Sequence, residues 1–68
     1  MDPKKIGAFL AELRKKKGKS QAEAARDLGI STAALSMYEM GERVPRDNIK
    51  IRIADYYKKS VGTIFFSK

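Results

Sequence analysis

Apolar residues recur at helical spacing in five successive stretches of the chain. The stretches are residues 4–17, 20–28, 31–40, 47–58 and 60–66. Within them the apolar side chains return every three or four positions, as on a helix with one buried face. The positions predicted to be buried are Ile6, Phe9, Leu10, Leu13, Ala24, Ala25, Leu28, Leu35, Tyr38, Ile49, Ile53, Ala54, Tyr57, Val61, Ile64 and Phe65. The pattern predicts an all-α fold of five helices.

Capping residues indicate where the second and third helices begin and end. Ser20 and Ser31 precede them, where a hydroxyl accepts a hydrogen bond from a free backbone N–H. Glu23 follows Ser20 by three residues and completes a capping box. Gly29 and Gly41 supply the turns that end the two helices. Two short helices joined by a glycine turn are typical of a helix-turn-helix, whose second helix enters the DNA major groove. For the fourth helix we expect Asp47 or Asn48 as the cap.

Composition narrows the class of protein. The 68 residues predict a single domain, 1–68, near the lower size limit for a core without disulfides or metal. There is no cysteine and no histidine, so disulfides and the usual zinc sites are excluded, and we expect neither metal nor cofactor. An enzyme is not expected, because the chain also lacks a carboxylate pair at catalytic spacing and a glycine-rich phosphate loop. No signal peptide or membrane-length apolar run is visible, so we expect no membrane association and a cytoplasmic protein, associated with the nucleoid when bound to DNA.

The charge balance favours a polyanionic partner. Fifteen Lys and Arg face eight Asp and Glu, which leaves a net charge of +7. Such a chain binds nucleic acid most readily and an anionic membrane surface less so, although a solvated basic surface without a partner is the alternative. The run Lys15, Lys16 and Lys17 fits either a solvated helix end or an edge that contacts phosphates.

The third helix leaves an unusually small and apolar set of side chains on its exposed side. These are Thr32, Ala33, Ser36 and Met37, with Met40 beyond them. Hydroxyls can bond several base edges, while Ala, Met and the Thr methyl can pack on the thymine methyl. The same face could instead contact a partner protein or a second copy. The candidates for the DNA backbone are Ser20, Gln21, Ser31, Arg43 and Arg46, although Gln21 could be an exposed cap neighbour and the arginines ordinary loop charges.

The stretch from Leu13 to Pro45 resembles the lambda-repressor and Cro-like (XRE-type) helix-turn-helix family, and further matches continue almost to the chain end. Matching positions are Leu13-Arg14, Ser20-Gln21, Ala25, Leu28-Gly29, Leu35, Tyr38-Glu39, Gly41, Pro45, Ile53-Ala54, Tyr57, Ser60-Val61 and Ile64-Phe65. Members of this family are five-helix DNA-binding domains that usually act as homodimeric repressors or regulators on palindromic operators. The resemblance therefore implies the same fold and activity here.

The resemblance also assigns roles to individual residues. It implies that Gln21 holds a phosphate, that Thr32, Ala33 and Met37 face bases with Ser36 beside them, and that Arg14 forms an ion pair with Glu39. The pair is also expected on physical grounds, because a carboxylate on a packed helix needs a cationic partner. The chain departs from the family at Ala24, Lys19 and Met40, where a leucine, an apolar residue and a polar phosphate ligand are common.

The end of the chain carries more aromatic residues than a small core easily holds. Either the core is rich in aromatic residues there, or the surplus forms a patch that binds a second copy. We favour a dimer patch of Tyr56, Ile64, Phe65 and Phe66, in which Phe66 is the best candidate if Phe65 belongs to the core. The sequence thus predicts a homodimeric, sequence-specific regulator of transcription that binds double-stranded DNA, and we expect a repressor. An antitoxin or a protein-interaction module with the same fold stays open.

Overall fold

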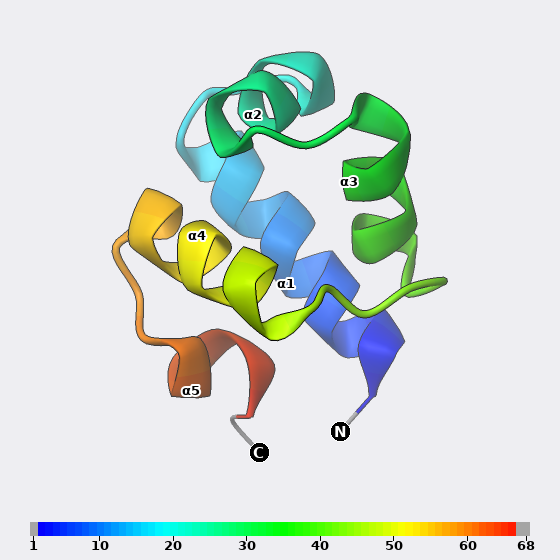
Figure 1. Ribbon diagram of the computed structural model, residues 1–68, viewed down its shortest axis with the longest axis vertical. Helices are drawn as coiled ribbons and strands as arrows, with labels where there is room; N and C mark the ends of the chain where they lie inside the picture. Colours follow the sequence, from blue (N-terminus) through cyan, green and yellow to red (C-terminus); the bar gives the residue numbers. More distant parts are fainter. Residues whose placement is uncertain (1, 67–68) are drawn as a thin grey trace.

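The computed structural model describes residues 2–66 and folds them into five α-helices joined by short loops (Figure 1). They are α1 (Pro3–Lys16), α2 (Gln21–Leu28), α3 (Thr32–Met40), α4 (Asp47–Tyr57) and α5 (Val61–Phe65). No strand occurs within these residues, and none of their helices is long and apolar enough to cross a membrane. The predicted all-α fold of five helices is confirmed, with every helix end within one residue of its predicted place.

The ends of α2 and α3 follow from local sequence. Ser20 Oγ accepts the N–H of Glu23 at 3.1 Å, and Glu23 Oε1 accepts the N–H of Ser20 at 2.9 Å, which forms the predicted capping box. At the start of α3, Ser31 Oγ accepts the N–H of Ala34 at 3.0 Å. Gly29 and Gly41 follow the two helices with φ of 75° and 76°, the left-handed region where glycine is unstrained.

The start of α4 differs from the prediction. Arg46, rather than Asp47 or Asn48, occupies the N-cap position, and no side chain caps the helix. The Arg46 carbonyl accepts the N–H groups of Ile49 and Lys50, both at 2.9 Å, so the first hydrogen bonds of the helix begin there. Asp47 is thereby the first helical residue, where its carboxylate still complements the helix dipole and lies 3.7 Å from Lys50 Nζ.

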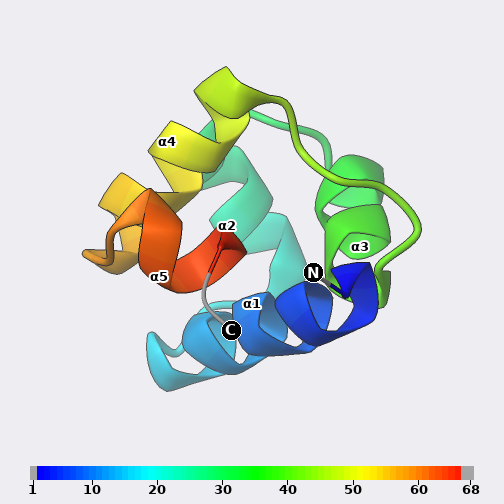
Figure 2. The same ribbon diagram turned by 90° about the horizontal axis from the view of Figure 1, so that it is seen from below.

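The hydrophobic core lies between α1 and the helices packed against it. Figure 1 shows α3 to one side of α1 and the pair α4 and α5 to the other, and Figure 2 shows that α1 runs along the edge of the molecule with all three above it. The largest fully buried side chains are Leu10, Leu35, Ile53, Ile64 and Phe65, and α2 adds Ala24, Ala25 and Leu28. Each large apolar side chain removed from water contributes about 1.5–3 kcal/mol to folding. The core thus holds α3 in place through the buried face of this helix.

The backbone of α1 approaches that of α3 closely at Gly7, which is buried. A Cβ at this position would lie 2.3 Å from the carbonyl oxygen of Glu39 and 2.6 Å from that of Tyr38. Side chains do not tolerate such contacts with backbone atoms, so only glycine allows this crossing. The short spacing brings the last turns of α3 against α1.

Two residues of the predicted dimer patch are instead core residues. Ile64 and Phe65 are 2% and 1% exposed within a single chain, because α5 packs against both α4 and α1. Their assignment to a dimer interface is therefore wrong. Tyr56 is half-buried, while Phe66 stays 60% exposed. Of the two alternatives, the structure has the core that is rich in aromatic residues at this end of the molecule. Among the four residues of the predicted patch, only Phe66 is classed as exposed.

Candidate nucleic-acid interface

The four predicted base-contacting residues lie on one side of α3. Thr32 and Ala33 are exposed, and Ser36 and Met37 are half-buried one turn further along. Residues four apart on a helix are neighbours, so the four side chains form two adjacent rows. The opposite face buries Leu35 and Glu39. Since Glu39 is the only charged residue of α3, the exposed surface of this helix is uncharged.

The N-termini of α2 and α3 each offer hydrogen-bond donors. The first N–H groups of a helix have no partner within it, and they carry the positive end of the helix dipole. Ser20 and Ser31 both use Oγ to accept a bond from their own helix, so each hydroxyl keeps its O–H to donate. Gln21, the first residue of α2, is half-buried. Both termini therefore suit an anion such as a phosphate.

A hydrogen-bonded cluster of Arg14, Gln21 and Glu39, here called the Glu39 cluster, ties α1, α2 and α3 together. Arg14 Nε donates to Glu39 Oε2 at 2.8 Å, and Arg14 Nη2 donates to Oε1 at 3.1 Å. The two side chains are 12% and 4% exposed. The bond to Glu39 raises the pKa of Arg14 above its usual value, against the opposing effect of burial. A third Arg14 nitrogen donates to the carbonyl of Lys19 at 2.9 Å.

Gln21 completes the Glu39 cluster, because its Nε2 donates to Glu39 Oε1 at 2.9 Å. The sequence predicted an ion pair between Arg14 and Glu39 and a phosphate contact for Gln21. It did not predict that Gln21 contacts Glu39. The contact spans 18 positions along the chain, and no local spacing signals it. An amide nitrogen carries two N–H groups, so the bond to Glu39 leaves the second one for another acceptor.

The loop from residue 42 to 46 starts by folding back on α3. The N–H groups of Glu42 and Arg43 both point to the carbonyl of Met37, at 2.9 and 3.4 Å. Further along, Pro45 is buried and anchors the loop. Arg43 and Arg46 are exposed, and neither forms an ion pair with another residue between 2 and 66. Both arginines are thus available in the segment that follows α3.

The lysine run divides between two environments. Lys15 and Lys16 are exposed at the end of α1. Lys17 turns toward α4, where its Nζ lies 4.8 Å from the centre of the Tyr56 ring, a cation–π distance. Nearby, Lys19 Nζ lies 3.6 Å from Asp27 Oδ2.

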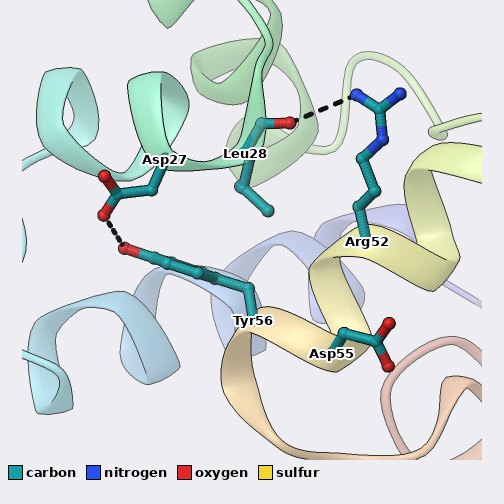
Figure 3. A pocket seen from close by; sticks show the side chains of 5 residues that line it. All are labelled: Asp27, Leu28, Arg52, Asp55 and Tyr56. Atoms are coloured by element: carbon teal, nitrogen blue, oxygen red, sulfur yellow. Dashed lines mark hydrogen bonds between the residues drawn. The ribbon is translucent and has the colours of Figure 1, made fainter.

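Tyr56 lines a shallow pocket between α2 and α4, together with Asp27, Leu28, Arg52 and Asp55 (Figure 3). Its hydroxyl donates to Asp27 Oδ2 at 2.6 Å, and this bond lowers the pKa of Asp27. Burial and the same bond raise the pKa of Tyr56 above its usual value. Phe66 lies elsewhere, with its ring 5.0 Å from Lys50 Nζ. The structure thus directs Tyr56 toward α2 and does not bring it to Phe66 as a common patch.

A family model described as helix-turn-helix matches residues 10–64, a segment that includes α2, α3 and α4 in full. The chain belongs to the XRE-type helix-turn-helix family. This family consists of DNA-binding transcriptional regulators, a class that is not enzymatic.

Two phage-derived proteins are similar in sequence. The ImmF control region 10 kDa protein of Bacillus phage phi105 is 41% identical over 54 residues, which is 79% of this chain and 60% of that protein. The cryptic phage CTXphi transcriptional repressor RstR of Vibrio cholerae is 39% identical over 60 residues, 88% of this chain and 54% of that protein. The chain thus spans between about half and 60% of the length of these curated relatives.

A solved structure shares the fold of this helix-turn-helix protein. The clp gene regulator ClgR from C. glutamicum superposes with a TM-score of 0.81, over 97% of this chain and 86% of that one. The two sequences are 23% identical, so the likeness concerns the fold alone.

Proposed function

We propose that this helix-turn-helix protein binds double-stranded DNA sequence-specifically and represses transcription, with α3 lying in the major groove. The observation that carries the proposal is the uncharged, small-residue surface of α3 between two sources of positive charge. On one side are the helix N-termini at Gln21 and Thr32, and on the other are the exposed Arg43 and Arg46. A helix in the major groove meets base edges on one face and phosphates on both flanks. An uncharged face with positive charge on either side of it fits this arrangement.

Within this proposal the residues divide by task. Thr32, Ala33, Ser36 and Met37 contact base edges through hydroxyl bonds and thymine-methyl packing. Ser20, Gln21, Ser31, Arg43 and Arg46 bind phosphates. Arg is absent from α3 itself, so the direct base contacts are weak individually and DNA shape contributes to specificity. The name of the similar CTXphi protein, a transcriptional repressor, supports repression as the outcome.

We further propose that two copies act together on an inverted repeat. The described molecule measures 28 × 23 × 22 Å, so one copy reaches only a few base pairs and gives little genomic specificity. A two-fold pair places its recognition helices one DNA turn apart, about 34 Å. Phe66 is 60% exposed next to α5, which lies at the opposite end of the molecule from α2 (Figure 1). It is the aromatic side chain most available to a second copy.

The proposal is tested by selecting bound duplexes from a random DNA pool with the full chain. We expect an enriched inverted repeat whose half-sites are centred about 10 base pairs apart. On that site, Thr32→Ala should change the preference at one base pair by about 1–3 kcal/mol. Arg43→Ala should weaken binding to all sequences by similar factors, because phosphates carry no sequence information. A pool without enrichment, or a uniform loss from Thr32→Ala, would contradict the assignment of α3.

The dimer is tested separately with Phe66→Ser, which changes a side chain outside the core. Sedimentation should show a shift toward monomer, and binding should weaken more on the full repeat than on a half-site. Ile51→Ser is the matched control, since Ile51 is 55% exposed on α4. An unchanged oligomeric state in Phe66→Ser would refute this placement, and a wild type that is monomeric at high concentration would refute the pair altogether.

A further inference from the structure

The carboxylate of Glu39 contacts the amide that we propose to bind phosphate. Glu39 Oε1 accepts from Gln21 Nε2 at 2.9 Å and from Arg14 Nη2 at 3.1 Å, while Oε2 accepts from Arg14 Nε at 2.8 Å. Gln21 makes no other side-chain hydrogen bond among residues 2–66. Its second Nε2–H and its Oε1 are therefore both available, and their positions depend on which way the amide is turned.

A free glutamine presents its amide in either of two orientations, because rotation about the last side-chain bond costs little. In one orientation the NH₂ group can donate to a phosphate, and in the other the carbonyl oxygen would repel it. An ionised carboxylate only accepts hydrogen bonds, so Glu39 requires the nitrogen of Gln21 to face it. The contact at 2.9 Å thereby selects one orientation before any anion arrives. The second N–H on the same nitrogen is held ready to donate.

A carboxylate near a phosphate would repel it unless its charge were balanced. Arg14 provides the balance through its two bonds to Glu39, and its own position is held by the bond to the Lys19 carbonyl. The side chains of both residues are largely buried, so water screens this pair little. The phosphate would therefore meet a neutral pair and an oriented amide.

We propose that Glu39 is a positioning residue for DNA-backbone binding, which orients the Gln21 amide toward phosphate while Arg14 cancels its charge. This inference rests on the proposed phosphate contact of Gln21. It gives the ion pair a role in binding, beyond holding α1 against α3. It also predicts that Glu39 affects DNA affinity only through Gln21.

The test is a double-mutant cycle on DNA affinity with Gln21→Ala, Glu39→Gln and both changes together. The probe is the duplex from the random-pool selection, followed by fluorescence anisotropy at a temperature where circular dichroism shows every variant folded. Gln21→Ala should weaken binding about tenfold for each copy on the duplex, the value of one hydrogen bond to a charged group, and so about a hundredfold for a pair on the inverted repeat. Glu39→Gln should weaken it by up to the same factor, because a neutral amide accepts more weakly than a carboxylate and its NH₂ opposes the donors of either Gln21 or Arg14. The double variant should bind as Gln21→Ala does.

A purely structural Glu39 would give a different cycle. Glu39→Gln would then weaken binding by the same factor with or without Gln21, and this additive result would overturn the inference. Ile64→Val, a core change in α5 far from the Glu39 cluster, is the control for general loss of stability and should leave affinity unchanged in the folded range. A wild type that binds no duplex would defeat the proposed function itself, whereas binding with an additive cycle would defeat this inference alone.

A second measurement needs no variant at position 39 and so does not depend on its folding. The two Nε2 protons of Gln21 give separate NMR signals, and hydrogen exchange of each can be followed in the wild type. One proton should be protected in the free protein, and the other should become protected and shift when the duplex is added. Two protons that exchange equally fast in the free protein would show that Glu39 does not hold the amide, and would overturn the proposal.

Discussion

Replacing Gly7 by alanine should destabilise the protein, even though alanine is the better helix former. Helix propensity alone favours alanine by about 1 kcal/mol in the interior of a helix such as α1. The new Cβ would lie 2.3 Å from the Glu39 carbonyl oxygen, about 1 Å inside the 3.4 Å at which ordinary van der Waals contact begins. The opposing atoms belong to the backbone of α3 and cannot move aside as a side-chain end can, so the helices must separate.

The two effects can be weighed against each other. Overpacking of this kind costs about 1–3 kcal/mol, and contact with backbone at 2.3 Å places Gly7→Ala at the upper end. After the gain in propensity the net loss is about 2 kcal/mol. A chain of 68 residues has a free energy of unfolding of about 3–10 kcal/mol, so the loss is a large fraction of it.

The assay is urea unfolding followed by circular dichroism, with Gly62→Ala as the matched control. A Cβ at Gly62 in α5 meets nothing closer than Ser60 Oγ at 4.0 Å, so only the propensity effect remains there. Gly62→Ala should raise the free energy of unfolding by about 0.5–1 kcal/mol. Gly7→Ala should lower it, with the urea midpoint falling by roughly 2 M for a slope of about 1 kcal/mol/M. Two midpoints that both rise would refute the close approach of α1 to α3.

Two further predictions concern buried polar groups. Arg14→Ala and Glu39→Ala should each lower the free energy of unfolding by about 3–5 kcal/mol, because each leaves a buried charge without its partner. The double variant should lose less free energy of unfolding than the sum of the two single changes. Additive losses in urea unfolding would show that the two side chains do not interact. Tyr57→Phe should unfold at the same or a higher urea concentration at pH 7, because the Tyr57 hydroxyl is buried without a hydrogen-bond partner among residues 2–66. Burial first, and then the charge of Glu39, raise the pKa of Tyr57 to about 12. As pH rises from about 10, the unfolded chain therefore loses the Tyr57 proton before the folded chain does. Wild type should then lose stability relative to Tyr57→Phe between pH 10 and 12. A difference in free energy of unfolding between the two proteins that stays constant over this range would contradict the raised pKa.

The helices could be predicted from sequence because their signals are local. Ser20, Ser31, Gly29 and Gly41 act within one turn of their own position, and the apolar period covers each helix separately. Position 46 shows the limit of such signals. Asp47 and Asn48 are both favoured cap residues, yet the cap is Arg46, and no side chain accepts a free N–H of the helix there.

Features that depend on packing between distant segments could not be predicted in the same way. Gly7 gives no sign in the sequence that α3 crosses above it, since Glu39 lies 32 positions away. Phe65 and Phe66 are adjacent and identical in kind, and only the packing of α5 against α1 and α4 buries the first and exposes the second. The link from Gln21 to Glu39 likewise exists only in the folded arrangement of α2 and α3.

The most direct test of the proposed DNA-binding face is an NMR titration of the isotope-labelled protein with the selected duplex. Backbone N–H signals report every part of the chain at once, so the contact surface is located without any mutation. The largest shifts should fall at the N-termini of α2 and α3 and in the loop from residue 42 to 46, with the smallest in α5 away from Phe66. The largest shifts in the pocket between Asp27 and Tyr56, with none at Gln21 or Thr32, would contradict the account.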